Sequence, residues 1–153
     1  MIISENAPPK AIMNMIMKYM PNWKRRVFTC GSMLYNPNGL RLEAGTARHE
    51  EKHSDQQTHY GANWKKPLIL KERVKSWWEQ YLHNYAFRLA MEIPAYQAQF
   101  REYKKVIIDP NERVRLARAL AYSLCVLDMD EKLISPNEAT DAIRSEKNFT
   151  FKV

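Results

Sequence analysis

His49-Glu50-Glu51-Lys52-His53 is the stretch around which the rest of the sequence is organised. On a helix, residues four apart share a face, so the imidazoles of His49 and His53 point to one spot. Two imidazoles held in this way occupy two corners of a zinc tetrahedron, with nitrogen–zinc distances of about 2.0–2.1 Å. Glu50 then stands beside the first histidine, where it can take a proton from water at the metal. This H-E-x-x-H pattern is typical of metal-dependent peptidases.

The segment around these histidines has no apolar anchor. Between Ala47 and His59 there is no Leu, Ile, Val, Phe or Met. A helix that is polar on every side has no apolar stripe to bury against a core. A metal ion bound by His49 and His53 would hold such a helix in place. The alternative is a solvated polar helix that carries two unrelated histidines.

Length and composition are those of an ordinary globular protein. The 153 residues, 45% of them hydrophobic, predict one domain over 1–153, with tails at 1–8 and 148–153. The formal net charge of +7 favours anionic partners and says nothing about fold. Cys30 and Cys125 lie outside any metal-ligand spacing, which favours free thiols in a reducing compartment. Without a secretory signal or a run of about 18 apolar residues, we expect a soluble protein of the cytoplasm or a host-cell interior, with no membrane contact.

The apolar pattern predicts an α+β, mostly helical fold with a small antiparallel sheet or hairpin before the histidine helix. A methionine-rich stripe at helical spacing predicts a first helix between Pro9 and Pro21. Residues 27–30, 32–35 and 40–42 are strand candidates, and Asn36-Pro37-Asn38-Gly39 is a strong turn signal between the last two. Thr46 is the expected N-cap of the histidine helix.

Helices are expected for most of the second half. Residues 72–89 carry an aromatic-rich stripe at helical spacing. Glu92-Ile93-Pro94 predicts a kink or a fresh helix start, because proline disfavours helical geometry at Ile93 and removes a backbone donor. Asp109-Pro110-Asn111-Glu112 and Ser135-Pro136-Asn137-Glu138 are start signals for two further helices.

Two histidines need a third protein ligand, and Glu92 is the first candidate. The segments His49-Glu50-x-x-His53-x-x-Gln56 and Glu92-x-x-Ala95-Tyr96 together resemble small gluzincin-like zinc metallopeptidase domains of bacterial and phage type. In those domains a Gln often follows the second histidine at this spacing, and the ligand Glu lies in an E-x-x-A segment. The resemblance covers about residues 25–107. It implies a zincin-like domain in which His49, His53 and Glu92 bind zinc.

His59 is the alternative third ligand, at the spacing of the metzincin signature. That signature has Gly where Gln56 stands here, because the chain must turn sharply. On a continuous helix His59 lies about 9 Å along the axis from the second histidine, out of reach of a shared metal. The sequence therefore favours Glu92. Glu51 and Lys52 depart from the resemblance, since these positions are usually apolar or small in active peptidases of this kind.

The expected function is zinc-dependent hydrolysis of peptide or amide bonds, with Glu50 as general base towards metal-activated water. A further side chain would stabilise the oxyanion, and the candidates are Tyr96, Tyr85 and His83. The substrate would be a peptide, a protein or a peptidoglycan cross-link. In zincins an extended substrate pairs with a strand before the histidine helix, which would be 32–35 or 40–43 here.

Two other classes of function stay open. A catalytically inactive zincin-fold module would bind a partner without hydrolysing it, and the charged Glu51-Lys52 pair favours that class. A basic nucleic-acid-binding protein is suggested by the net charge and by Lys24-Arg25-Arg26, Lys65-Lys66, Arg113, Arg115 and Arg118. Nucleic acid is the least favoured partner, because the aromatic residues fall on stripes expected to be buried and no recognition motif is present. The oligomeric state is not determined by the sequence.

Overall fold

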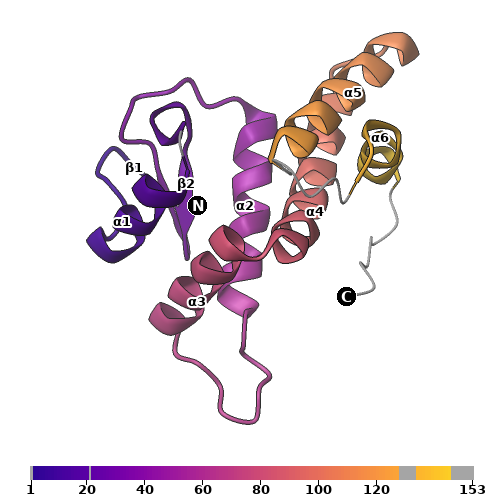
Figure 1. The fold of residues 1–153 in the computed structure, drawn as a ribbon. Helices are drawn as coiled ribbons and strands as arrows, with labels where there is room; N and C mark the ends of the chain where they lie inside the picture. The colour runs from indigo at the N-terminus through magenta and orange to yellow at the C-terminus, as the bar shows by residue number, and fades with distance from the viewer. Residues whose placement is uncertain (1, 21, 128–133, 146–153) are drawn as a thin grey trace. The chain divides into compact units, whose positions relative to one another are not determined.

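The computed structural model of the protein describes residues 2–20, 22–127 and 134–145 (Figure 1). These residues form six α-helices, one 3-10 turn and three short strands, which confirms the mostly helical α+β class. The chain divides into two compact units: residues 1–42 with 50–84, and residues 43–49 with 85–153. The expected tail at 148–153 lies outside the described residues. None of the described helices is long and apolar enough to cross a membrane.

The first unit contains a three-stranded sheet with strand order β1-β3-β2. β1 (Ile2–Ser4) pairs in parallel with β3 (Met33–Tyr35), and β2 (Phe28–Cys30) pairs with β3 in antiparallel register. β2 and β3 form a hairpin whose turn contains Gly31 at φ +62°, a conformation that favours glycine. The sheet is thus mixed, because residues 2–4, which the sequence assigns to a tail, add a parallel strand.

The turn at residues 36–39 is present, but the strand expected after it is not. The Gly39 N–H donates to the Asn36 carbonyl at 3.2 Å. The Asn36 side chain also accepts from the Leu40 N–H at 2.9 Å and donates to the Leu40 carbonyl at 2.8 Å. Both backbone groups of Leu40 are therefore bonded to a side chain and are not available for strand pairing. The prediction of a strand over 40–42 was wrong for this reason.

Two helices of the first unit pack on each other: α1 (Lys10–Tyr19) and α3 (Leu70–His83). The expected stripes are buried on both, at Ile12, Met13 and Ile16 on α1 and at Val74, Trp77, Trp78, Tyr81 and Leu82 on α3. Between them in sequence lies the 3-10 turn η1 (Trp23–Arg25). α3 ends at Asn84, whose backbone is extended (φ −121°, ψ 108°), so the single helix expected over 72–89 is two helices.

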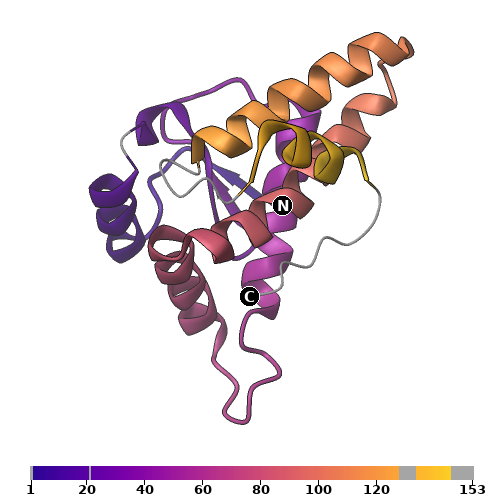
Figure 2. The same cartoon turned by 45° about the vertical axis from the view of Figure 1, so that its right-hand side comes forward.

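The second unit is built from α4 (Tyr85–Lys104), α5 (Pro110–Leu127) and α6 (Pro136–Arg144), which pack on one another (Figure 2). Their shared core consists of Leu89, Ile93, Phe100, Ala117, Leu120, Ala121, Leu124, Ile134, Ala139, Ala142 and Ile143. The expected starts of α5 and α6 are confirmed. Asp109 Oδ1 accepts from the Asn111 N–H at 2.9 Å, and the Ser135 hydroxyl accepts from the Glu138 N–H.

Pro94 lies inside α4, so of the two outcomes expected at residues 92–94, a kink or a fresh helix start, the fresh start was wrong. A proline in a helix interior costs about 3 kcal/mol or more, because it removes one backbone hydrogen bond and crowds the preceding turn. Its neighbours Ile93 and Ala95 are completely buried. Burial of such side chains stabilises the helix by an amount comparable to that cost. The helix therefore continues, and it carries Glu92 on the same rigid element as the residues that follow.

Candidate metal centre

The H-E-x-x-H motif lies on α2 (Ala44–His59), a continuous helix of 16 residues. The helix begins three residues earlier than expected, because the Glu43 carbonyl already accepts from the Ala47 N–H at 2.9 Å. Thr46 therefore lies in the first turn and is not the N-cap. His49 and His53 are separated by one helical turn, which directs both side chains to the same side of α2.

One face of α2 is polar and nevertheless buried. His49, Glu50, His53 and Gln57 are 8%, 9%, 6% and 0% exposed. The absence of apolar residues thus does not leave this helix solvated, as the alternative interpretation of the sequence required. Buried polar groups must find hydrogen-bond partners, and each of these four side chains has one. α2 is held by specific polar contacts rather than by an apolar stripe.

His49 is enclosed by three side chains of α4. Its Nε2 lies 3.4 Å from Oε2 of Glu92, which is itself only 3% exposed. Its Nδ1 lies 3.1 Å from Oε1 of Gln99. The ring of Tyr96 meets the imidazole edge to face, with centroids 4.6 Å apart. Since α4 residues 92, 96 and 99 recur at helical spacing, a single face of α4 supplies all three contacts.

His53 is fixed by its own helix and by α3. Its Nδ1 lies 2.8 Å from Oε1 of Gln56. The rings of Trp77 and Tyr81 lie 5.4 and 6.1 Å from the imidazole, centroid to centroid. An amide oxygen only accepts hydrogen bonds, so the neutral imidazole carries its proton on Nδ1 and presents the lone pair of Nε2.

His49, His53 and Glu92 form a buried group that can hold a metal ion. Each offers one ligand atom, and these atoms all lie within 4.8 Å of one another. Two imidazoles and one carboxylate are a donor set that suits zinc with a fourth position left for water. Glutamine oxygens on the second ring nitrogens are the kind of outer contact that orients metal-binding histidines. The residues present therefore fit a divalent metal of this type.

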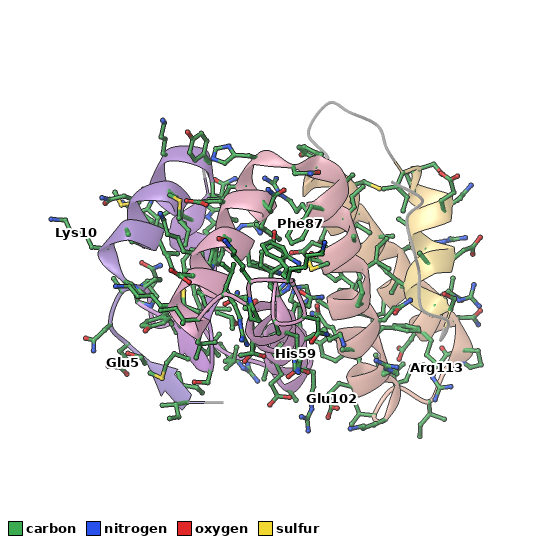
Figure 3. All side chains as sticks on the ribbon, turned by 90° about the horizontal axis from the view of Figure 1, so that it is seen from below. Glu5, Lys10, His59, Phe87, Glu102 and Arg113 are labelled. Carbon is green, nitrogen blue, oxygen red and sulfur yellow. The ribbon has the colours of Figure 1, made fainter. Side chains whose placement is uncertain are left out.

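His59 does not belong to this group. It lies in the last turn of α2, exposed, with its Nδ1 2.7 Å from the backbone carbonyl of Asp55 (Figure 3). Because the helix runs on without the sharp turn that the metzincin spacing requires, the geometry favours Glu92 as third ligand.

Glu50 is oriented by Thr29 of β2. The Thr29 hydroxyl lies 2.7 Å from Oε2 of Glu50 and 3.2 Å from the Glu50 carbonyl. Thr29 is 1% exposed, so the hydroxyl is shielded from competing water. A hydroxyl that donates to one carboxylate oxygen fixes the plane of the carboxylate and leaves its second oxygen for another contact. Thr29 carries no signal in the sequence, since threonine is an ordinary residue in a short strand.

The three candidates for stabilising an oxyanion lie in different surroundings. Tyr96 is half-buried and its ring contacts His49. Tyr85 is the first residue of α4, with the guanidinium of Arg88 4.9 Å from its ring centroid. His83 is exposed at the end of α3, where its ring meets that of Tyr19 on α1 at 4.4 Å. The contact between Tyr96 and His49 links Tyr96 directly to the metal group.

Neither strand proposed for substrate pairing has a free edge. β3, within the expected segment 32–35, is the central strand and is paired on both sides, and residues 40–43 form no strand. The outer edge of β2 is covered too. The Gln57 amide accepts from the Gly31 N–H at 2.7 Å and donates to the Thr29 carbonyl at 2.8 Å, as a paired strand would. The Trp78 indole N–H donates to the same carbonyl at 3.1 Å.

Among the basic residues that suggested a nucleic-acid-binding function, Arg113 makes hydrogen bonds within the protein. The Arg113 guanidinium donates to the backbone carbonyls of Ile107 at 2.6 Å and Lys104 at 3.2 Å (Figure 3). It thereby satisfies the carbonyl of Lys104, the last residue of α4, which a helix end leaves without an intrahelical partner, and one carbonyl of the loop that follows. Arg115 and Arg118 on α5 are exposed.

No protein-family model, curated protein or solved structure matches this chain. Its function is therefore inferred from the geometry of the site.

Proposed function

We propose that this protein is a zinc-dependent hydrolase of peptide or amide bonds, resembling gluzincin-type peptidases. The observation that carries the proposal is the buried group of His49, His53 and Glu92, with ligand atoms within 4.8 Å of one another. Exposed acidic and histidine side chains meet by chance on many surfaces, whereas burying three such groups together costs free energy unless something binds them. H-E-x-x-H on a helix adds the general base that hydrolysis needs.

His49 and His53 would bind zinc through Nε2, and Glu92 through a carboxylate oxygen. When bound, zinc supplies a Lewis acid that polarises a carbonyl and lowers the pKa of water. Glu50 would accept the proton of the attacking water on the carboxylate oxygen that Thr29 does not occupy, and would return it to the leaving amine. Tyr96 stands beside His49, where its hydroxyl is the first candidate to donate a hydrogen bond to the oxyanion.

The closed strand edges bear on the class of substrate. An extended polypeptide bound by strand addition needs a free edge, and β3 and β2 offer none; the other edge strand, β1, is separated from β2 and its Glu50 partner Thr29 by β3. Among a peptide, a protein and a peptidoglycan cross-link, the proposal favours a short peptide or a cross-link, because neither needs to pair along β2 or β3.

Metal analysis and a matched pair of glutamine variants test the proposal. Purified protein should contain about one zinc ion per chain, and the wild type should cleave members of a quenched fluorescent peptide library or a soluble peptidoglycan fragment. Glu50→Gln should keep the zinc and lose hydrolysis, since an amide cannot act as the base. Glu51→Gln makes the same change one residue along and should keep both. Retained hydrolysis in Glu50→Gln would refute the assignment of the base.

A metal-binding module without hydrolytic activity is the second candidate. The observations that favour it are the covered edge of β2 and the hydrogen bond of the Glu50 carboxylate to Thr29. Both are contacts that a purely structural site would also make. Stoichiometric zinc without turnover of any substrate, and with Glu50→Gln unchanged in stability and zinc content, would favour this module over the enzyme.

A further inference from the structure

We infer that a hydrogen-bond chain, Glu43–Tyr103–Gln99–His49, determines which nitrogen of His49 carries the proton and which is free to bind the metal. This inference deepens the proposed function, because it assigns positioning residues to the proposed zinc ligand His49. Gln99 and Tyr103 lie four residues apart on α4, and Glu43 directly precedes α2. None of these three residues is part of the H-E-x-x-H pattern or of the E-x-x-A segment.

Glu43 determines the order of donors and acceptors in this hydrogen-bond chain. The Tyr103 hydroxyl donates to Oε2 of Glu43 at 2.7 Å. An ionised carboxylate only accepts hydrogen bonds, so the single proton of the Tyr103 hydroxyl is committed to Glu43. Burial, and next the hydrogen bond to Glu43, raise the pKa of Tyr103 above its usual value, so the hydroxyl keeps that proton. Any other polar group that contacts the phenol oxygen must therefore donate to it.

That requirement orients the amide of Gln99. Gln99 forms a side-chain hydrogen bond with Tyr103 that lowers the phenol pKa, the effect of a donor. Only the NH₂ group of the amide can donate, so it faces Tyr103 and the carbonyl oxygen faces the other way. Oε1 of Gln99 is indeed the atom that lies 3.1 Å from Nδ1 of His49.

The tautomer of His49 follows from the orientation of Gln99. Because Oε1 only accepts, the proton of the neutral imidazole must be on Nδ1. Nε2 then carries the lone pair, and Nε2 is the nitrogen that lies 3.4 Å from Oε2 of Glu92. Without this chain, a proton on Nε2 could bond to Glu92 and would have to leave before a metal could bind.

Gly45 leaves room for the ring of Tyr103, a member of the hydrogen-bond chain. A Cβ on Gly45 would lie 2.5–2.9 Å from three ring carbons of Tyr103, closer than any real side chain permits. Glycine inside a helix costs about 1 kcal/mol relative to alanine. The close approach of the Tyr103 ring to the first turn of α2 gives a physical reason for glycine at this position.

The Nδ1 atom of His53 contacts a side chain of its own helix, unlike that of His49. Its Nδ1 contacts Oε1 of Gln56, three residues along the same helix. Helix geometry alone brings those two side chains together, so His53 does not depend on a second element in this way. The inference therefore predicts that disturbing Tyr103 affects His49 and leaves His53 unchanged.

Zinc affinity and the ¹⁵N spectrum of His49 test the role of this hydrogen-bond chain. Affinity is measured by competition with a chromogenic chelator. Gln99→Leu should weaken zinc binding about 10–100-fold, the effect usual for outer contacts of metal-binding histidines. Tyr103→Phe, which keeps the ring, should weaken it less and in the same direction. Gln99→Glu keeps an acceptor for Nδ1 of His49 but cannot donate to Tyr103, so it should recover part of the affinity that Gln99→Leu loses. Gln97→Leu is the matched control, since Gln97 is a buried α4 glutamine that donates to the Ala142 carbonyl.

A readout that needs no metal separates this inference from the proposed function. Long-range ¹H–¹⁵N spectra of zinc-free protein, at a pH where the imidazoles are neutral, should show the proton of His49 on Nδ1. In Gln99→Leu it should move to Nε2, while His53 stays unchanged. A wild type with the His49 proton on Nε2, or Gln99→Leu with wild-type affinity, would overturn the inference. A wild type that binds no zinc would overturn the proposed function, and the spectra would still test the chain.

Discussion

Loss of the Glu92 carboxylate should remove most of the stabilisation of the protein by zinc. Glu92→Gln removes one of the three grouped ligand atoms and keeps the size of the side chain. Zinc sites with four protein ligands bind with about 10–16 kcal/mol, so one ligand contributes about 2.5–4 kcal/mol. That is a loss of about 10²–10³-fold in affinity. At a free zinc concentration 100 times the wild-type Kd, wild-type protein gains about 2.7 kcal/mol, and a variant weakened 100-fold gains only about 0.4 kcal/mol.

Thermal unfolding with and without zinc measures this difference. For a chain of this size each kcal/mol shifts Tm by about 2–4 °C, so zinc should raise the wild-type Tm by about 5–11 °C and that of Glu92→Gln by about 1 °C. Glu102→Gln is the matched control, because Glu102 is also on α4 and pairs with Arg48 and Lys105. It should show the full wild-type shift. If Glu92→Gln shows the full shift as well, Glu92 is not a ligand and the proposed site is wrong.

Three further predictions concern residues outside the metal group. His59→Ala should leave zinc affinity at the wild-type value in the chelator assay, because its Nδ1 is bonded to the Asp55 carbonyl; a loss above tenfold would restore the metzincin-like alternative. In folded protein, Cys125 should react with a thiol reagent well before Cys30, since burial raises the pKa of the Cys30 thiol to about 12; equal rates would contradict this. Ser135→Ala should lower the free energy of unfolding by about 1 kcal/mol in denaturant titrations through loss of the α6 cap, with no change in zinc affinity.

The elements that sequence predicted well are those with strong local signals. The start of α6 depends on a serine cap, a proline and a glutamate within four residues, and each acts on its own backbone neighbourhood. The aromatic stripe of α3 repeats often enough that its spacing identifies the buried face. Local chemistry of this kind can be predicted because it depends on few residues that are close in sequence.

The failures of prediction have tertiary causes. The apolar stripe continues from α3 into the first turns of α4, so spacing alone did not reveal the end of α3 at Asn84. Pro94 is tolerated because its neighbours are buried, which cannot be known without the partners that bury them. Residues 2–4 form a strand only because β3 is there to pair with them.

The candidate site was predictable in its ligand residues and not in what surrounds them. H-E-x-x-H is a short-range pattern, and Glu92 came from a resemblance in a second segment. Gln99 could have been noticed, since it lies seven residues after Glu92 and thus on the same face of α4. Thr29 and Tyr103 gave no signal, because their roles depend on contacts with residues 21 and 60 positions away.

An apolar replacement of the His49–Glu92 pair separates a functional site from a structural one. Replacing a buried pair of ionisable side chains by apolar side chains is often neutral or stabilises a protein by about 1–4 kcal/mol. If the pair serves a metal, His49→Leu combined with Glu92→Leu should leave metal-free protein at least as stable as metal-free wild type, and zinc should no longer raise its Tm. If the pair serves the fold, the double variant should be destabilised. The single variant Glu92→Leu buries the polar His49 imidazole against an apolar side chain and should be less stable than the double variant in either case, which tests whether the two positions are coupled.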